Sequence, residues 1–227
     1  MPRYYCLINQ AIKMIQINGL QFKYRDGTEW DKYIINDELQ GDMYEIPKNP
    51  KVVIDIGAHI GGTSILCASK GAEVFAYEPK KSNFDLLVEN VALNGFQNKI
   101  HCFNKGVGNA GKRKLWLFQN NSGMPSLMND RFVQTRTEYE MVDVISFDEV
   151  MKDITHCDFM KVDCEGAEWE FLLNLSEENA NKIDRIAAEL HFEGNEQIGR
   201  YLEKFYKVNA RPNLEAHCNN RFINCIK

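Results

Sequence analysis

The chain of 227 residues contains no long hydrophobic run, and its seven cysteines include no C-x-x-C pair. No apolar stretch approaches membrane-spanning length, and residues 1–10 lack the apolar core of a secretory leader. An odd number of dispersed thiols is typical of reduced cysteines in a cytoplasm. We therefore expect a cytoplasmic protein with no disulfide and no membrane partner.

The sequence also lacks internal repeats, low-complexity tracts and linkers. No three of its His, Asp and Glu residues have a metal-binding spacing such as H-E-x-x-H, so we predict no metal site. The formal net charge is −5, and no basic tract is interleaved with aromatic residues. Proteins that bind a phosphate backbone usually present a basic face, so no nucleic-acid partner is expected.

The length suits one large α/β domain with a substantial core. Residues 51–227 alternate regularly between apolar strand patterns and helical patterns, and we assign them to this domain. Residues 1–50 lack that rhythm and are too few to bury a core of their own, so we predict an N-terminal extension or cap. Within it, residues 17–28 suggest a short hairpin strand with an Asp26-Gly27 turn.

The most informative segment is Val52 to Gly62, an apolar run that ends in Asp55 and a glycine loop. A second apolar run, residues 72–77, ends in the carboxylate of Glu78. This order predicts strand, glycine loop, helix, strand and acid, which is half of a nucleotide-binding α/β sheet. The structural alternative is a parallel strand whose turn uses glycine only to start a helix.

The loop favours S-adenosylmethionine (SAM) over a dinucleotide. A dinucleotide site reads G-x-G-x-x-G, whereas here His59 occupies the place of the middle glycine and would obstruct a phosphate. SAM carries an ammonium for Asp55 and a ribose whose hydroxyls can donate to Glu78. Gly57 and Ala58 would pass close to its methionine moiety, and the helix N-terminus would favour its carboxylate.

The remaining elements complete an alternating α/β pattern. We predict strands at 51–56, 72–77, 99–104, 157–162, 183–190, 205–209 and 219–226, and helices at 60–70, 81–94, 165–174 and 195–204. Alternation of this kind implies a parallel sheet with a ligand at the carboxyl ends of its strands. Asn104, at the end of the third strand, is where an adenine contact would lie. The rhythm breaks over residues 105–141, and we expect the acceptor-facing residues there and in residues 1–50.

Three segments together resemble the FkbM family of SAM-dependent methyltransferases: VVIDIGAHIGGTS, AYEPKKSNFDLLVENVALNG and FMKVDCEGAEWEFL. The resemblance runs from Val52 to His191. It implies a Rossmann-like class I methyltransferase fold: a mostly parallel seven-stranded sheet, helices on both faces and a final antiparallel strand. It places Asp55, Gly57, Gly61 and Glu78 on SAM-binding positions, and Lys161, Asp163, Glu165, Gly166 and Glu168 on the family's K-x-D-x-E-G-x-E motif. His59 departs from the family, which usually carries Asn there.

Methyl transfer to a hydroxyl needs an aligned oxygen and a group that accepts its proton. Asp163 follows the fourth core strand and is our first catalytic candidate. Glu165 and Glu168 are expected on the first turn of a helix, where Glu165 acts as cap or catalyst and Glu168 is the more structural. Alternation places Glu189 and His191 on one face, and a histidine near its usual pKa is a natural general base. The alternative for His191 is a hydrogen-bonded structural residue.

The leading hypothesis is O-methylation of a hydroxyl on a sugar, glycan or small metabolite, as the resemblance implies. Signatures for methylation of amines (Asn-Pro-Pro-Tyr) and pyrimidine carbon (Pro-Cys) are absent. The alternatives are an RNA-modifying methyltransferase, a non-catalytic SAM-binding protein and a nicotinamide-dependent oxidoreductase, which the missing glycine disfavours. Residues 122–126 are a candidate loop over the active site. A basic groove would favour RNA, and its candidate residues are Lys80, Lys81, Lys112, Arg113 and Lys114.

Overall fold

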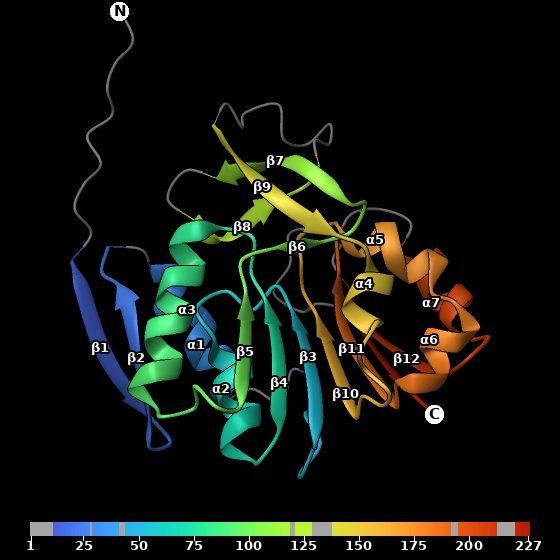
Figure 1. Ribbon diagram of the computed structural model, residues 1–227, viewed down its shortest axis with the longest axis horizontal. Helices are drawn as coiled ribbons and strands as arrows, with labels where there is room; N and C mark the ends of the chain where they lie inside the picture. The colour runs from blue at the N-terminus through green and yellow to red at the C-terminus, as the bar shows by residue number, and fades with distance from the viewer. Residues whose placement is uncertain are drawn as a thin grey trace, which may run out of the picture.

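The computed structural model describes residues 11–27, 29–40, 44–118, 121–128, 138–191, 195–212 and 221–227. A seven-stranded sheet of order β12-β13-β11-β10-β3-β4-β5 forms its centre (Figure 1). The strands are β3 (Val52–Ile56), β4 (Glu73–Tyr77), β5 (Ile100–Phe103), β10 (Phe159–Val162), β11 (Arg185–Leu190), β12 (Lys207–Pro212) and β13 (Arg221–Ile226).

The central sheet is mixed. Strands β11, β10, β3, β4 and β5 pair in parallel, each with its neighbour in that order. Strand β13 is antiparallel to both β11 and β12, so the expected final antiparallel strand is confirmed. Crossover helices explain the parallel core, because parallel neighbours cannot be joined by a tight turn.

Helices cover both faces of this sheet. They are α1 (Glu29–Gln40), α2 (Gly62–Ser69), α3 (Lys81–Leu93), α4 (Phe147–Met151), α5 (Glu168–Phe171), α6 (Glu177–Lys182), α7 (Glu196–Leu202) and the 3₁₀ helix η2 (Leu172–Asn174). Val53 joins the core under α1, α2 and α3, whereas the adjacent Ile54 joins the core under α4 to α7. Because successive side chains alternate in direction, a strand covered on both faces must be apolar throughout, as β3 is apart from Asp55.

The N-terminal segment differs from its prediction. Strands β1 (Ile12–Ile17) and β2 (Leu20–Arg25) form an antiparallel hairpin. Its turn is Asn18-Gly19, with φ values of 52° and 82°, so the prediction of an Asp26-Gly27 hairpin turn is wrong. Two positive φ values match the twist of a two-residue hairpin, and Asn-Gly is the pair that adopts them most readily. Helix α1 follows and was not predicted.

Two asparagines of α3 attach this hairpin to the domain. The Asn90 side chain accepts from the backbone N–H of Lys23 (2.7 Å) and donates to the carbonyls of Lys23 (3.1 Å) and Ile60 (2.9 Å). Asn94 makes the equivalent pair of bonds with Gln21, at 2.9 and 2.7 Å. A primary amide carries both a donor and an acceptor, so each asparagine continues the ladder at the edge of β2.

A second, four-stranded sheet of order β6-β9-β7-β8 contains the residues where the sequence rhythm breaks. Its strands are β6 (Gly106–Val107), β7 (Gly111–Phe118), β8 (Asn121–Ser126) and β9 (Tyr139–Ile145). It lies beyond the carboxyl ends of the central strands (Figure 1). The loop predicted at residues 122–126 is therefore wrong, since these residues form strand β8. Part of the longer polar loop expected around them lies outside the described residues.

The helix predicted at 165–174 begins later than expected. Residues 165–167 form a turn, α5 begins at Glu168, and the segment continues as η2. Glu165 has a φ of 54°, which is left-handed and incompatible with a helical first turn. The start of α4 is capped, because the Ser146 hydroxyl accepts from the backbone N–H of Glu149 at 3.2 Å.

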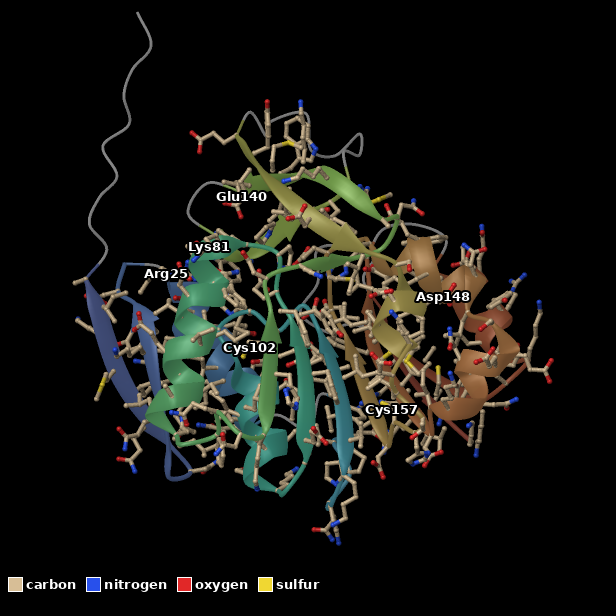
Figure 2. All side chains as sticks on the ribbon, viewed as in Figure 1. Arg25, Lys81, Cys102, Glu140, Asp148 and Cys157 are labelled. Carbon is tan, nitrogen blue, oxygen red and sulfur yellow. The ribbon has the colours of Figure 1, made fainter. Side chains whose placement is uncertain are left out.

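The described cysteines are all free thiols, namely Cys67, Cys102, Cys157, Cys164 and Cys225. Figure 2 shows Cys102 and Cys157 well apart in the molecule. The other two lie outside the described residues. Among the described helices, none combines the length and apolarity needed to cross a bilayer.

Candidate cofactor and acceptor site

Four strands deliver their following residues to one edge of the central sheet. Gly57 follows β3, Glu78 follows β4, Asp163 follows β10 and His191 follows β11. Parallel strands bring their carboxyl ends together, so residues distant in sequence become neighbours here. This edge holds the sequence-predicted site.

Packing requires the first glycines of the loop. Gly57 has a φ of 81°, and a Cβ there would lie 1.7 Å from the carbonyl oxygen of Asp163. Gly61 has a φ of 100°, and a Cβ there would meet Leu87 at 2.7 Å. Ala58 is buried, and its backbone N–H donates to the carbonyl of Tyr77 at 3.0 Å. The glycines thus let the loop lie against β10 and α3.

His59 serves this loop through its backbone. It adopts a φ of 50°, and its N–H donates to Glu78 Oε2 at 2.9 Å. Its ring faces the N-terminal segment, with Nε2 3.5 Å from Asp31 Oδ1, and burial lowers the pKa of His59. Burial alone would raise the pKa of Asp31, but bonds from His59 and Arg25 hold it well below its usual range. The ring therefore belongs to a buried polar cluster with α1.

The Glu78 side chain, predicted to bind a ribose, is held by backbone groups of the loop. Its two oxygens accept backbone N–H groups from His59 (2.9 Å) and Lys80 (2.8 Å). The Asn83 side chain also donates to Oε1, at 3.4 Å. A carboxylate oxygen has about two acceptor positions, so the free position lies on Oε2. Burial raises the pKa of Glu78 to about 7, and added donors would favour its ionised form. The amide of Asn104 donates to the carbonyls of Glu78 (2.9 Å) and Pro79 (3.0 Å), so it braces the segment beside this ribose position.

Asp55 is fully buried beneath the loop. One oxygen accepts from the Ser64 hydroxyl at 2.6 Å, and the other lies 3.4 Å from the ammonium of Lys161. Lys161 also donates to the carbonyl oxygen of Gly57 at 2.6 Å. Lys161 thus occupies, at Asp55 and the loop carbonyl, the place that the sequence analysis expected for the SAM ammonium.

Asp163 stands between two groups of polar residues. The hydroxyl of Tyr44 donates to its Oδ2 at 3.0 Å, and the Lys161 ammonium lies 3.9 Å from the same oxygen. Its Oδ1 lies 3.9 Å from His191 Nε2. The Asp163 side chain is 27% exposed, more than Glu165 or Glu189 beside it. A ligand at the sheet edge therefore has better access to Asp163 than to its acidic neighbours.

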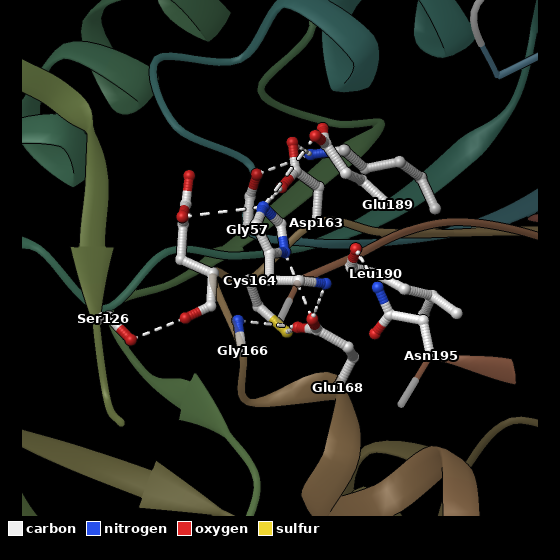
Figure 3. Close-up of polar contacts among 12 residues, drawn as sticks. Gly57, Ser126, Asp163, Cys164, Gly166, Glu168, Glu189, Leu190 and Asn195 are labelled. Carbon is white, nitrogen blue, oxygen red and sulfur yellow. Dashed lines mark hydrogen bonds and ion pairs between the residues drawn. The ribbon is translucent and has the colours of Figure 1, made fainter. Parts of the chain in front are cut away.

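Carboxylates surround His191, among them Asp163, Glu168 and Glu189, which Figure 3 labels. Its Nδ1 lies 3.1 Å from Glu168 Oε1, and its Nε2 lies 3.5 Å from Glu165 and 3.9 Å from Glu189. Glu168 also accepts the backbone N–H groups of Gly166 (2.8 Å) and His191 (2.7 Å). Glu168 therefore holds both the turn at Gly166 and the ring of His191 in place. This is the structural role that the sequence analysis predicted for Glu168.

The expectation that His191 titrates near its usual pKa is wrong. Burial opposes its charge, but the carboxylates of Glu165 and Glu168 outweigh this effect and raise the pKa of His191 well above its ordinary value. Burial raises the pKa of Glu165 to about 8. At neutral pH His191 therefore holds a proton among these acids, and a protonated imidazole cannot act as the general base.

The acceptor side of this cluster borders the second sheet. The Ser126 hydroxyl, at the end of β8, donates to the carbonyl of Glu165 at 2.5 Å (Figure 3). This bond holds the left-handed Glu165 turn against β8. Cys164 lies in the same turn, and burial together with Glu168 raises the pKa of its thiol well above the usual value. A raised pKa disfavours reactivity at Cys164, because the thiolate is the reactive form of a cysteine.

Two groups of residues have ligand atoms close enough to share a cation. Asp163, Glu189 and His191 form one group, with those atoms within 4.8 Å of each other. The second, more exposed group is His156, Asp158 and Asp184. The absence of a metal remains a prediction.

Three polar residues that pack against the loop and the strand ends were not predicted from the sequence: Asp31, Glu38 and Tyr44, which lie on or beside α1. A usable signal was present, since positions 31, 35 and 38 are separated by four and three residues and share one helix face. The two acids on that face concealed its apolar character, although Ile35 is fully buried.

Comparison with known proteins places this fold among methyltransferases. A putative transferase from Pyrococcus horikoshii superposes with a TM-score of 0.57 at 16% identity, covering 96% of this chain and 72% of that one. The P. horikoshii TYW2 structure, in complex with MeSAdo, gives a TM-score of 0.54 at 17% identity, covering 95% and 70%. At these identities the likeness establishes the class of fold, a methyltransferase-like α/β domain.

The sequence profile described as the methyltransferase FkbM domain matches residues 55–222. The methyltransferase sdnD of Sordaria araneosa is 26% identical over 179 residues, which are 65% of this chain and 69% of that protein. The tRNA (guanine(37)-N(1))-methyltransferase of Aedes aegypti is 34% identical over 91 residues, which are 39% of this chain but 16% of that protein. The chain belongs to the FkbM family of SAM-dependent methyltransferases.

Proposed function

We propose that this methyltransferase transfers the methyl group of SAM to a hydroxyl of a sugar, glycan or other small metabolite. The observation that carries this proposal is the acidic acceptor edge, where Asp163, Glu165 and Glu189 surround one histidine. Such an edge repels a phosphate backbone but can bind neutral hydroxyls and accept their protons.

SAM, when bound, supplies a methyl group already activated by its sulfonium. Glu78 binds the ribose, and the Gly57–Gly61 loop lies beside the methionine end. Asn104 stays a candidate neighbour of the adenine, through its hold on the segment after β4.

Asp163 then accepts the proton of the acceptor hydroxyl. Tyr44 orients its carboxylate by donating to Oδ2, which leaves Oδ1 facing His191 and the acceptor side. His191, held by Glu168, positions this edge and limits the repulsion between its carboxylates. Glu165 is the second candidate base, because it lies 3.5 Å from His191 Nε2 and burial raises the pKa of its carboxyl to about 8. A competent proton acceptor at this place argues against a non-catalytic SAM-binding protein.

Labelled SAM incubated separately with a glycan or metabolite extract and with total RNA tests the proposal. We expect label in the small-molecule fraction, and Asp163→Asn should lower its rate about 10²- to 10⁴-fold with little change in SAM affinity. Asp153→Asn, an exposed position, is the matched control. A variant that keeps the wild-type rate would remove Asp163 from the chemistry.

The cofactor assignment has its own test. Glu78→Ala should weaken SAM binding by about 1.5–3 kcal/mol in calorimetry, because charge-assisted bonds to the ribose are lost. Equal affinity in the variant, or tighter binding of NAD than of SAM by the wild type, would contradict it.

RNA is the second candidate acceptor, favoured by the 34% identity to the tRNA methyltransferase over 91 residues. Against it, the candidate basic residues are largely engaged with acids. Lys81 pairs with Asp85, Lys112 lies 3.5 Å from Asp143, and Arg113 lies 2.6 Å from Glu170. Label appearing in RNA, and lost on Asp163→Asn, would establish this second candidate.

A further inference from the structure

Glu38 of α1 is a buried acid that the methyltransferase motifs do not include, since the family match begins at residue 55. Its Oε1 accepts from the Thr63 hydroxyl at 3.1 Å, on the first turn of α2. Its Oε2 is buried and, among the described residues, receives no hydrogen bond. An unsatisfied buried carboxylate oxygen is costly, so its retention calls for a partner that the described residues do not provide.

The position of this oxygen is at the SAM loop. A Cβ on Gly62 would lie 2.0 Å from Glu38 Oε2, so the carboxylate rests directly on the start of α2. This contact explains why residue 62, whose backbone is ordinary helix, is glycine. The loop that carries Gly57 to Gly61 therefore has an acid from α1 at its end.

The charges around Glu38 are unequal. The Lys161 ammonium lies 3.9 Å from Glu38, 3.4 Å from Asp55 and 3.9 Å from Asp163. Three buried or half-buried carboxylates thus share one lysine. One additional cation would balance Glu38, whereas a second anion would worsen the excess.

We propose that Glu38 binds the α-ammonium of SAM through Oε2, so that the N-terminal helix α1 is part of the cofactor site. This inference rests on the proposed use of SAM. Asp55 is the alternative partner, but it is already bonded to Ser64 and faces Lys161. The SAM carboxylate is a poor occupant for the position beside Glu38. Asp55 and Asp163 also lie close to Lys161, so the lysine already faces more negative groups than it can balance.

Calorimetric titration with two ligands tests the assignment. SAM carries the ammonium, whereas 5′-methylthioadenosine keeps the nucleoside but has a neutral thioether in place of the sulfonium and lacks the amino acid. Glu38→Gln should weaken SAM about 10- to 100-fold, the range for one charge-assisted hydrogen bond, and leave methylthioadenosine within about twofold. Exposed Glu196→Gln should change neither affinity.

A second measurement uses the wild type, so it does not depend on the folding of a variant. Burial raises the pKa of Glu38 to about 8. The Lys161 ammonium lowers this pKa, whereas Asp55 and Asp163 raise it further. Binding of an ammonium ionises Glu38, so SAM titrations at pH 7 in buffers of different ionisation enthalpy should show proton release. Methylthioadenosine, which lacks the ammonium and contacts only the Glu78 side through its ribose, should release fewer protons than SAM.

The outcomes separate the two proposals. Wild type that binds neither ligand overturns the cofactor assignment and this inference together. Wild type that binds SAM, with Glu38→Gln binding it equally well or losing both ligands equally, overturns the role of Glu38 alone. SAM binding that releases no more protons than methylthioadenosine binding also overturns the role of Glu38.

Discussion

Lys161 is the residue whose loss should damage the folded state most. It is 1% exposed, donates to the Gly57 carbonyl at 2.6 Å, and is the cation nearest Asp55. Lys161→Met keeps most of the side-chain volume but leaves Asp55 fully buried with no counter-ion. Removing one partner of a buried pair costs about 3–5 kcal/mol, because the remaining charge is uncompensated.

Urea unfolding at pH 7, followed by tryptophan fluorescence, measures this loss. A change of that size corresponds to a fall in Tm of roughly 6–20 °C, taking about 2–4 °C per kcal/mol for a protein of this length. Lys161→Met should lower stability at every pH between 6 and 9. The neighbouring acids raise the pKa of Lys161 against the effect of burial, so it stays charged below its unfolded pKa and its contribution is lost only at higher pH.

Two further variants, a control and a rescue, test whether the buried charges cause the loss of stability. Lys70→Met removes an exposed lysine and should change stability by less than about 0.5 kcal/mol. Adding Asp55→Asn to Lys161→Met should recover part of the loss, because it removes the uncompensated charge. A Lys161→Met protein within about 1 kcal/mol of wild type, at an unchanged m-value, would show that the buried charges are not coupled as described.

Three further predictions concern other parts of the chain. Asn90→Ala should lower the free energy of unfolding by about 2–4 kcal/mol, since three hydrogen bonds to the hairpin and loop are lost; exposed Val88→Ala is the control in the same urea experiment. Folded Glu38 keeps its proton from its ordinary pKa of 4.5 up to about 8 whereas the unfolded chain has released it, so this group lowers stability as pH rises through that window. Glu38→Gln should therefore be more stable than wild type at pH 8 and similar at pH 5 by thermal unfolding, and the opposite order would refute the burial of this acid. Thiol titration in denaturant should find all seven cysteines free, and a reproducible loss of two would indicate a disulfide.

Local sequence patterns were enough to predict the alternating strands and helices of the central sheet. The apolar run before Asp55, the glycine loop and the acid after β4 predicted the strands and the SAM side of the site. These signals are reliable because they depend on neighbours within a few residues, through side-chain alternation and the dihedral angles of glycine. The Asn18-Gly19 turn is an equally local signal, but the sequence offers a second turn pair nearby, Asp26-Gly27, and the hairpin was wrongly predicted to turn there.

The tertiary structure decided what no local pattern contains. Whether His191 is a base or a held imidazolium depends on Glu165 and Glu168, which come from a different strand end, and burial sets the strength of their effect. The part played by α1 was hidden for the same reason, since Glu38 acquires its meaning only where it rests on Gly62 and faces Lys161. Local sequence patterns identified the family, and they predict where the cofactor binds. Charge states and contacts between distant segments arise only when folding excludes water from them.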